Sequence, residues 1–96
     1  MPPERKKSIP VKMKDEVIGG VYTNNMMVAH TREEFVMDFL YVTPVQGVVN
    51  ARVITNPAHM KRIIRALQDN VAKYEAQFGH IPEVVPAEPM PDMEPN

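Results

Sequence analysis

The sequence predicts a small α+β domain in which a three-stranded antiparallel β-meander is followed by one long amphipathic C-terminal helix. Three observations predict this fold: three runs of apolar period two before residue 56, short turn-like connections between them, and an apolar stripe of helical period afterwards. The chain has 96 residues, of which 44% are hydrophobic and 24% are charged. A chain of this length can build only one hydrophobic core, which excludes several domains.

The three predicted strands are the runs VYTNNMMVAH (residues 21–30), FVMDFLYV (residues 35–42) and VVNARVIT (residues 48–55). The connections between them, residues 31–34 and 43–47, are rich in Thr, Glu, Pro and Gly and read as turns. Thr31 and Glu34 also have the spacing of a capping box on a one-turn helix. Short connections favour neighbouring antiparallel strands, and therefore a meander.

The helix has the clearest boundaries of the predicted elements. Asn56 is a good N-cap residue, Pro57 suits the first helical position, Gly79 suits a left-handed residue after the last turn, and Pro82 prevents continuation. Six apolar residues between these boundaries alternate four and three positions apart: Met60, Ile64, Leu67, Val71, Tyr74 and Phe78. This spacing gives one apolar stripe along the whole helix.

One helix covers only one face of a three-stranded sheet. We expect it to cover the face that carries the aromatic residues of the second strand. The opposite face then keeps five large aliphatic residues without a partner: Val36, Leu40, Val42, Val48 and Ile54. Because a small domain needs the free energy of burying such residues, we expect them to form the interface of a homo-oligomer, most simply a two-fold dimer.

The two ends of the chain differ from its middle in charge and in proline content. Residues 1–14 contain five basic residues and one acidic residue, whereas residues 82–96 contain four acidic residues, five prolines and no basic residue. These compositions predict a basic disordered arm (residues 1–16), a folded domain (17–81) and a Pro-rich acidic disordered tail (82–96). The acidic tail could also fold onto the basic arm.

The residues do not assemble into a recognisable catalytic site. His30, His59 and His80 lack the spacing that places two imidazoles on one helical face, and no phosphate-binding loop or nucleophile elbow is present. Asp38 and Arg52 interrupt the same predicted sheet face, and a cross-strand ion pair explains them better than a catalytic carboxylate. We therefore expect no enzyme, no catalytic residue, no cofactor and no metal. The absence of cysteine fits the cytoplasm, and no apolar run is long enough to cross a membrane.

A second class of function follows from the basic residues. Lys61, Arg62 and Arg65 lie in the N-terminal half of the helix, where positive side chains oppose the helix dipole. Together with the arm, including Lys6 and Lys7, they could bind phosphates of a nucleic acid. The alternative is that these basic residues only face the solvent and bind no ligand.

Several short motifs carry a resemblance to a known family. They are Tyr22-x-Asn24, Glu34-Phe35-x-x-Asp38-Phe39, Ala51-Arg52-Val53, Pro57 to Lys61, and the ending Leu67, Asn70, Tyr74-Glu75, Phe78-Gly79-x-Ile81. In these motifs the chain resembles a family of small uncharacterised bacterial and archaeal proteins of similar length. The family is a domain of unknown function, so the resemblance implies no activity, cofactor or catalytic residue.

The leading expectation is thus a small, cytoplasmic, non-catalytic oligomeric protein that acts as an interaction or assembly module through an apolar sheet face or edge. The alternative expectation is a nucleic-acid-binding protein that uses the basic arm and the basic start of the helix.

Overall fold

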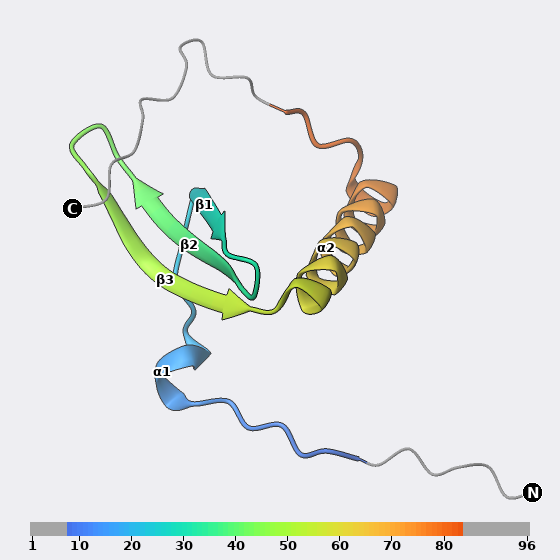
Figure 1. The fold of residues 1–96 in the computed structure, drawn as a ribbon. Coiled ribbons are helices and arrows are strands. Elements are labelled where there is room, and N and C mark those ends of the chain that lie inside the picture. The colour runs from blue at the N-terminus through green and yellow to red at the C-terminus, as the bar shows by residue number, and fades with distance from the viewer. Residues whose placement is uncertain (1–7, 84–96) are drawn as a thin grey trace, which may run out of the picture.

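The computed structural model describes residues 8–83 of the chain. A short helix, α1 (Asp15–Ile18), precedes the strands β1 (Asn25–His30), β2 (Phe35–Val42) and β3 (Gly47–Thr55), and the long helix α2 (Pro57–Phe78) follows them (Figure 1). The three strands form one antiparallel sheet in the order β1-β2-β3. The predicted β-meander with a C-terminal helix is therefore confirmed.

Helix α1 was not predicted, and it begins inside the segment that the sequence indicated as an arm. It has four residues, and Lys14 at its N-cap forms no side-chain hydrogen bond with it. Residues 1–7 of the predicted arm and 84–96 of the predicted tail lie outside the described residues.

Both hairpin turns use a threonine in the same way. Thr31 Oγ1 accepts hydrogen bonds from the N–H groups of Glu33 and Glu34, at 3.3 and 3.2 Å. Thr43 Oγ1 accepts from the N–H groups of Val45 and Gln46, both at 3.3 Å. The backbone N–H of each threonine donates to the carbonyl oxygen three residues later, which closes each turn at 2.9 Å. Thr31 and Glu34 thus close a hairpin turn rather than cap a helix.

A β-bulge in β3 shifts the register in the middle of the sheet. Phe39 pairs with Ala51, but the next residue of β2, Leu40, pairs with Val49, so that Asn50 has no counterpart on β2. Residues that pair directly in antiparallel strands share a face. Val48 therefore lies on the face of Tyr41, not on the face of Leu40 where the sequence analysis placed it. A strict alternation of faces along β3 placed Val48 on the face of Leu40. The extra residue of the bulge moves Val48 to the other face.

The two ends of α2 are fixed by the residues that the sequence predicted. Asn56 Oδ1 accepts a hydrogen bond from the N–H of His59 at 2.8 Å, and Pro57 is the first helical residue. Gly79 ends the helix with a positive φ of 98°, as expected, but its ψ of 171° differs from that of a left-handed helical residue. This conformation is essentially restricted to glycine, and it sends the chain away from the helix in an extended direction.

Helix α2 does not lie along the sheet. It makes few close contacts with the strands, and Figure 1 shows that it diverges from the sheet beyond its start next to β3. Met60 in its first turns is buried and Ile63 is half-buried, but the later apolar residues are exposed. The expectation that the helix covers the aromatic face of the sheet is therefore not met along most of the length of α2.

Candidate functional site

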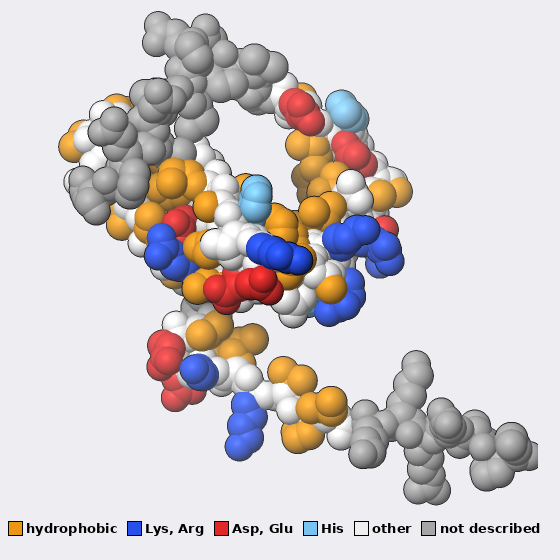
Figure 2. All heavy atoms as spheres, in the orientation of Figure 1, with side chains coloured by type: hydrophobic (Ala, Val, Ile, Leu, Met, Phe, Trp, Pro, Cys, Tyr) orange, Lys and Arg blue, Asp and Glu red, His pale blue; other side chains and the backbone are white. Residues whose placement is uncertain are grey.

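One uncovered apolar feature of residues 8–83 is the apolar stripe of α2. We call the six residues predicted from their spacing the α2 stripe: Met60, Ile64, Leu67, Val71, Tyr74 and Phe78. Met60 is buried at 8% exposure, whereas the other five are exposed, from Val71 at 47% to Phe78 at 66%. Figure 2 shows apolar side chains gathered on the side of α2 that is turned toward the sheet, with open space in front of them. A continuous exposed apolar surface of this kind is a candidate interaction surface.

The predicted interface on the sheet is only partly available for a partner. Its members have different exposures: Leu40 is buried at 5% exposure, Val36 and Val42 are half-buried, and Val48 and Ile54 are exposed. Since Val48 lies on the other face, four of the five share one face. Leu40 already has its apolar surface covered within the chain, so this face offers less area than the α2 stripe.

The side chains of Asp38 and Arg52 form a two-pronged ion pair between β2 and β3. Arg52 Nε donates to Asp38 Oδ1 at 2.7 Å, and Arg52 Nη2 donates to Asp38 Oδ2 at 2.9 Å. The carboxylate side chain is 12% exposed and that of Arg52 is 63% exposed, so the arginine covers the acid on its solvent side. These hydrogen bonds, with a smaller Coulomb attraction, lower the pKa of Asp38 and raise that of Arg52. The geometry agrees with the structural role expected from the sequence, in which both carboxylate oxygens are occupied.

The Tyr-x-Asn motif fastens the chain before β1 onto the sheet. Asn24 Nδ2 donates to the carbonyl oxygen of Val42 at 3.0 Å, and Asn24 Oδ1 accepts from the Val42 N–H at 2.8 Å. The ring of Tyr22 packs edge-on against that of Tyr41, with centroids 5.8 Å apart. The bulged residue Asn50 donates from Nδ2 to the carbonyl oxygen of Tyr22 at 2.9 Å. This motif therefore has a structural explanation, which sequence spacing alone did not provide.

Glu75 organises the turn that follows α2. Its Oε2 accepts from the N–H of Ile81 at 2.8 Å and lies 3.1 Å from Nδ1 of His80. These residues, with Val71 and Glu83, line an open pocket beside the end of the helix. Glu75 and His80 already contact each other. We therefore assign them to the structure of this turn and not to a ligand-binding site.

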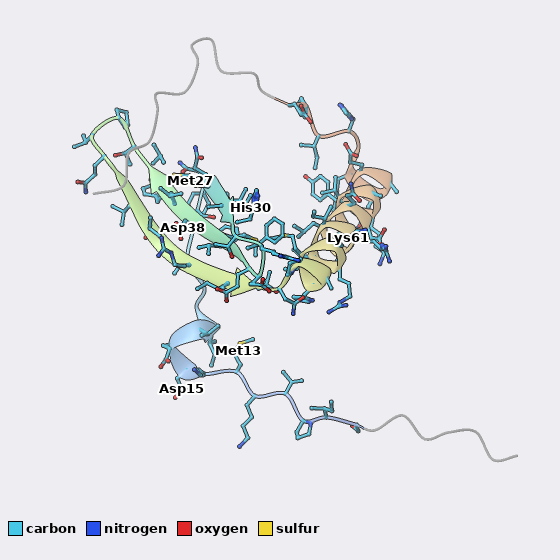
Figure 3. The ribbon with its side chains drawn as sticks, in the orientation of Figure 1. Met13, Asp15, Met27, His30, Asp38 and Lys61 are labelled. Atoms are coloured by element: carbon cyan, nitrogen blue, oxygen red, sulfur yellow. The ribbon has the colours of Figure 1, made fainter. Side chains whose placement is uncertain are left out.

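The predicted anion-binding residues do not come together in the described part of the chain. Lys61, Arg62 and Arg65 are exposed on α2, whereas the described residues of the arm run away from this helix (Figures 1 and 3). Lys6 and Lys7 lie outside the described residues. The start of α2 also has few free donors, because Pro57 lacks an N–H and the N–H groups of His59 and Met60 bond to Asn56.

His30 lies at the end of β1, where its ring packs against that of Phe35 with centroids 5.5 Å apart (Figure 3). Within residues 8–83, no three His, Asp or Glu side chains are grouped so that they could hold a metal ion. In the same residues no helix is both long enough and apolar enough to cross a lipid bilayer.

The comparison with protein families gives one match. A family model described as "Protein of unknown function (DUF3467)" matches residues 1–83. The chain belongs to this family. The resemblance drawn from the short motifs is thereby confirmed, and the family description names no activity. Searches of curated proteins and of solved structures found no match.

The match to DUF3467 begins at residue 1. The family model therefore includes the arm that the sequence analysis had separated from the domain, while the segment after residue 83 lies outside the match.

Proposed function

We propose that this DUF3467 protein is a non-catalytic homo-oligomeric assembly module whose folded unit is completed by a second copy. One observation carries the proposal: the α2 stripe remains exposed beyond Met60 although its apolar residues follow one side of the helix from end to end. The apolar side chains that are buried among residues 8–83 are Met37, Leu40 and Met60, and none of the described side chains is completely buried. Small domains with so little core gain their stability from oligomerisation or another additional constraint.

The α2 stripe supports self-association better than the sheet face does. The five exposed members of the stripe are continuous along one helix side, while the sheet face contains the buried Leu40 and the ion pair of Asp38 and Arg52. The proposal therefore keeps the oligomer expected from the sequence but places its main contact on α2. A cytoplasmic location is part of this proposal, since a chain without cysteine has no need of an oxidising compartment.

The test is the molar mass in solution, measured by light scattering after size exclusion over a wide range of protein concentration. The wild-type chain is expected to be dimeric or larger, and Leu67→Lys is expected to shift it toward the monomer. Leu67 is 62% exposed, so the substitution does not disturb the single folded chain, and circular dichroism checks this point. Ala76→Lys adds the same charge on the side of α2 away from the stripe and is expected to leave the mass unchanged.

The outcomes show whether the α2 stripe or the sheet face forms the contact. A wild-type chain that is monomeric at every concentration would refute the proposal. An oligomer that survives Leu67→Lys but dissociates with Ile54→Lys would assign the contact to the sheet face instead of α2.

Nucleic-acid binding is a second proposal, supported only by the exposure of Lys61, Arg62 and Arg65. It predicts that short oligonucleotides bind at low salt, that binding falls steeply as salt increases, and that Ala at these three positions weakens it. Fluorescence anisotropy of labelled oligonucleotides measures this. The absence of binding at low salt would exclude it.

A further inference from the structure

The spacing of the α2 stripe is that of a coiled-coil seam. Its six members are separated by four, three, four, three and four residues, which is the a/d pattern of a seven-residue repeat. In this pattern Met60, Leu67 and Tyr74 take the d positions, and Ile64, Val71 and Phe78 take the a positions. A seam of this period stays in contact with a second helix over its whole length as the two helices coil around each other.

The residues beside the seam show how such a second helix would be oriented. The residues that follow the d positions form one flank, which consists of Lys61, Gln68 and Glu75. This flank is positive near the start of α2, neutral in the middle and negative near the end. Two copies of the flank therefore have complementary charges only when the two helices run in opposite directions.

We propose that α2 packs antiparallel against α2 of a second copy of this chain, with Lys61 of each copy opposite Glu75 of the other. The inference rests on the proposed self-association and specifies its contact surface. The same register pairs Met60 with Phe78, Ile64 with Tyr74, and Leu67 with Val71 across the seam. In an antiparallel pair the same flank of each helix meets, so Gln68 of the two copies meet near the two-fold axis.

The parallel arrangement lacks this complementarity. It would place each flank beside the opposite flank of the second helix, so that Asn70 faces Glu75 and Ile63 faces Gln68, and neither pair joins opposite charges. It would also bring the two basic helix starts level with each other and align the two helix dipoles. The antiparallel arrangement opposes the dipoles and places each basic start beside Glu75 and the negative dipole end of the other helix.

The contacts of Glu75 fix the position of its carboxylate. Its Oε2 is held by the Ile81 N–H at 2.8 Å and by His80 Nδ1 at 3.1 Å, and the residue is half-buried. The carboxylate is therefore restrained beside the seam before a partner binds. A lysine that approaches a restrained carboxylate orders one flexible side chain instead of two, which lowers the entropic cost of the pair.

The α2 stripe lies on the side of α2 that is turned toward the sheet (Figure 2). Figure 1 shows that α2 and the sheet diverge from their junction, and Figure 2 shows apolar side chains on the side of α2 that borders this open space. A helix of 22 residues is about 33 Å long, and the α2 stripe runs along nearly all of it.

Charge reversal tests the pairing directly. Lys61→Glu and Glu75→Lys each replace two attractive contacts in the dimer by two repulsive ones, and each is expected to weaken the homodimer roughly tenfold. An equimolar mixture of the two variants restores both attractive pairs, so the heterodimer is expected to bind more tightly than either variant homodimer. Arg62→Glu, which makes the same charge change away from the seam, is the matched control and is expected to have little effect.

Cysteine crosslinking tests the direction of the helices. The chain contains no cysteine, so only the introduced thiols can react with the crosslinker. With a short bis-maleimide, Gln68→Cys is expected to crosslink with itself, and Lys61→Cys is expected to crosslink with Glu75→Cys in a mixture. Phe78→Cys alone is expected to remain uncrosslinked, because the antiparallel pair separates the two helix ends.

The results distinguish this inference from the proposed function. A wild-type dimer in which Phe78→Cys crosslinks with itself and the mixture of charge variants stays weak would overturn the antiparallel pairing while leaving self-association intact. A wild-type monomer would overturn both.

Discussion

The side chains with the most defined contacts are polar residues that join neighbouring strands or brace a turn. Asp38 uses both carboxylate oxygens to bind Arg52, and Asn24 uses both ends of its amide to bind the backbone of Val42. A side chain that satisfies two backbone groups in this way replaces a missing strand residue at the end of the β1-β2 ladder. Such contacts fix geometry in a sheet that has few buried apolar residues.

The ion pair of Asp38 makes a prediction for acidic solutions. Its hydrogen bonds from Arg52 lower the pKa of the folded carboxylate below the value of about 3.9 expected in an unfolded chain. The pair therefore contributes stability above the unfolded pKa, and this contribution is lost as the pH falls toward the folded pKa. Asp38→Asn is expected to lower the urea midpoint at neutral pH and to flatten its decline on acidification.

The measurement is the urea midpoint of both proteins from neutral pH to about pH 3, at one fixed protein concentration. Glu33→Gln, in the exposed turn between β1 and β2, is the control and should follow the wild-type curve. Parallel pH curves for the wild type and Asp38→Asn would show that the ion pair does not contribute to acid sensitivity.

At the scale of elements, local signals in the sequence predicted the three strands and α2, although β1 begins at Asn25 and not at residue 21. The alternation of apolar residues gave the three strands, and Asn56, Pro57 and Gly79 gave the helix ends, because each of these residues acts on its own backbone. The bulge at Asn50 and the short helix α1 were missed. Helix α1 has only four residues, too few to show a helical period, although Gly19 ends it. The bulge is accompanied by a contact with Tyr22, which is distant in the sequence.

The cap of α2 gives a prediction at this scale. Asn56→Ala removes the acceptor of the His59 N–H and is expected to destabilise the protein by about 1 kcal/mol. Urea denaturation followed by circular dichroism at a fixed concentration measures the difference. Asp69→Ala, an exposed substitution in the interior of the same helix, serves as the control.

A cap that contributes nothing would leave both variants with the midpoint of the wild type. That result would mean that the apolar contacts of α2 alone stabilise it, and that loss of the first helical turn does not change the free energy of unfolding.

At the scale of the whole molecule, the sequence predicts an uncovered apolar surface on the sheet and a helix that is packed against the opposite sheet face. An amphipathic helix next to a sheet normally packs on it, and for this reason α2 was expected to cover one face. In the structure α2 diverges from the sheet, so the α2 stripe beyond Met60 is exposed as well. The period of a helix shows which side is apolar, but it does not show which surface that side contacts.

If a second copy completes the fold, thermal stability must depend on protein concentration. Dissociation accompanies unfolding in such a protein, so mass action raises the Tm as the concentration rises. For a dimer of this size a tenfold increase in concentration is expected to raise the Tm by about 4 °C. Leu67→Lys is expected to lower the Tm and remove its dependence on concentration, while Ala76→Lys keeps both. A wild-type Tm that stays constant over a wide concentration range would instead show that one chain completes its own folding and that the exposed α2 stripe is available to a different partner.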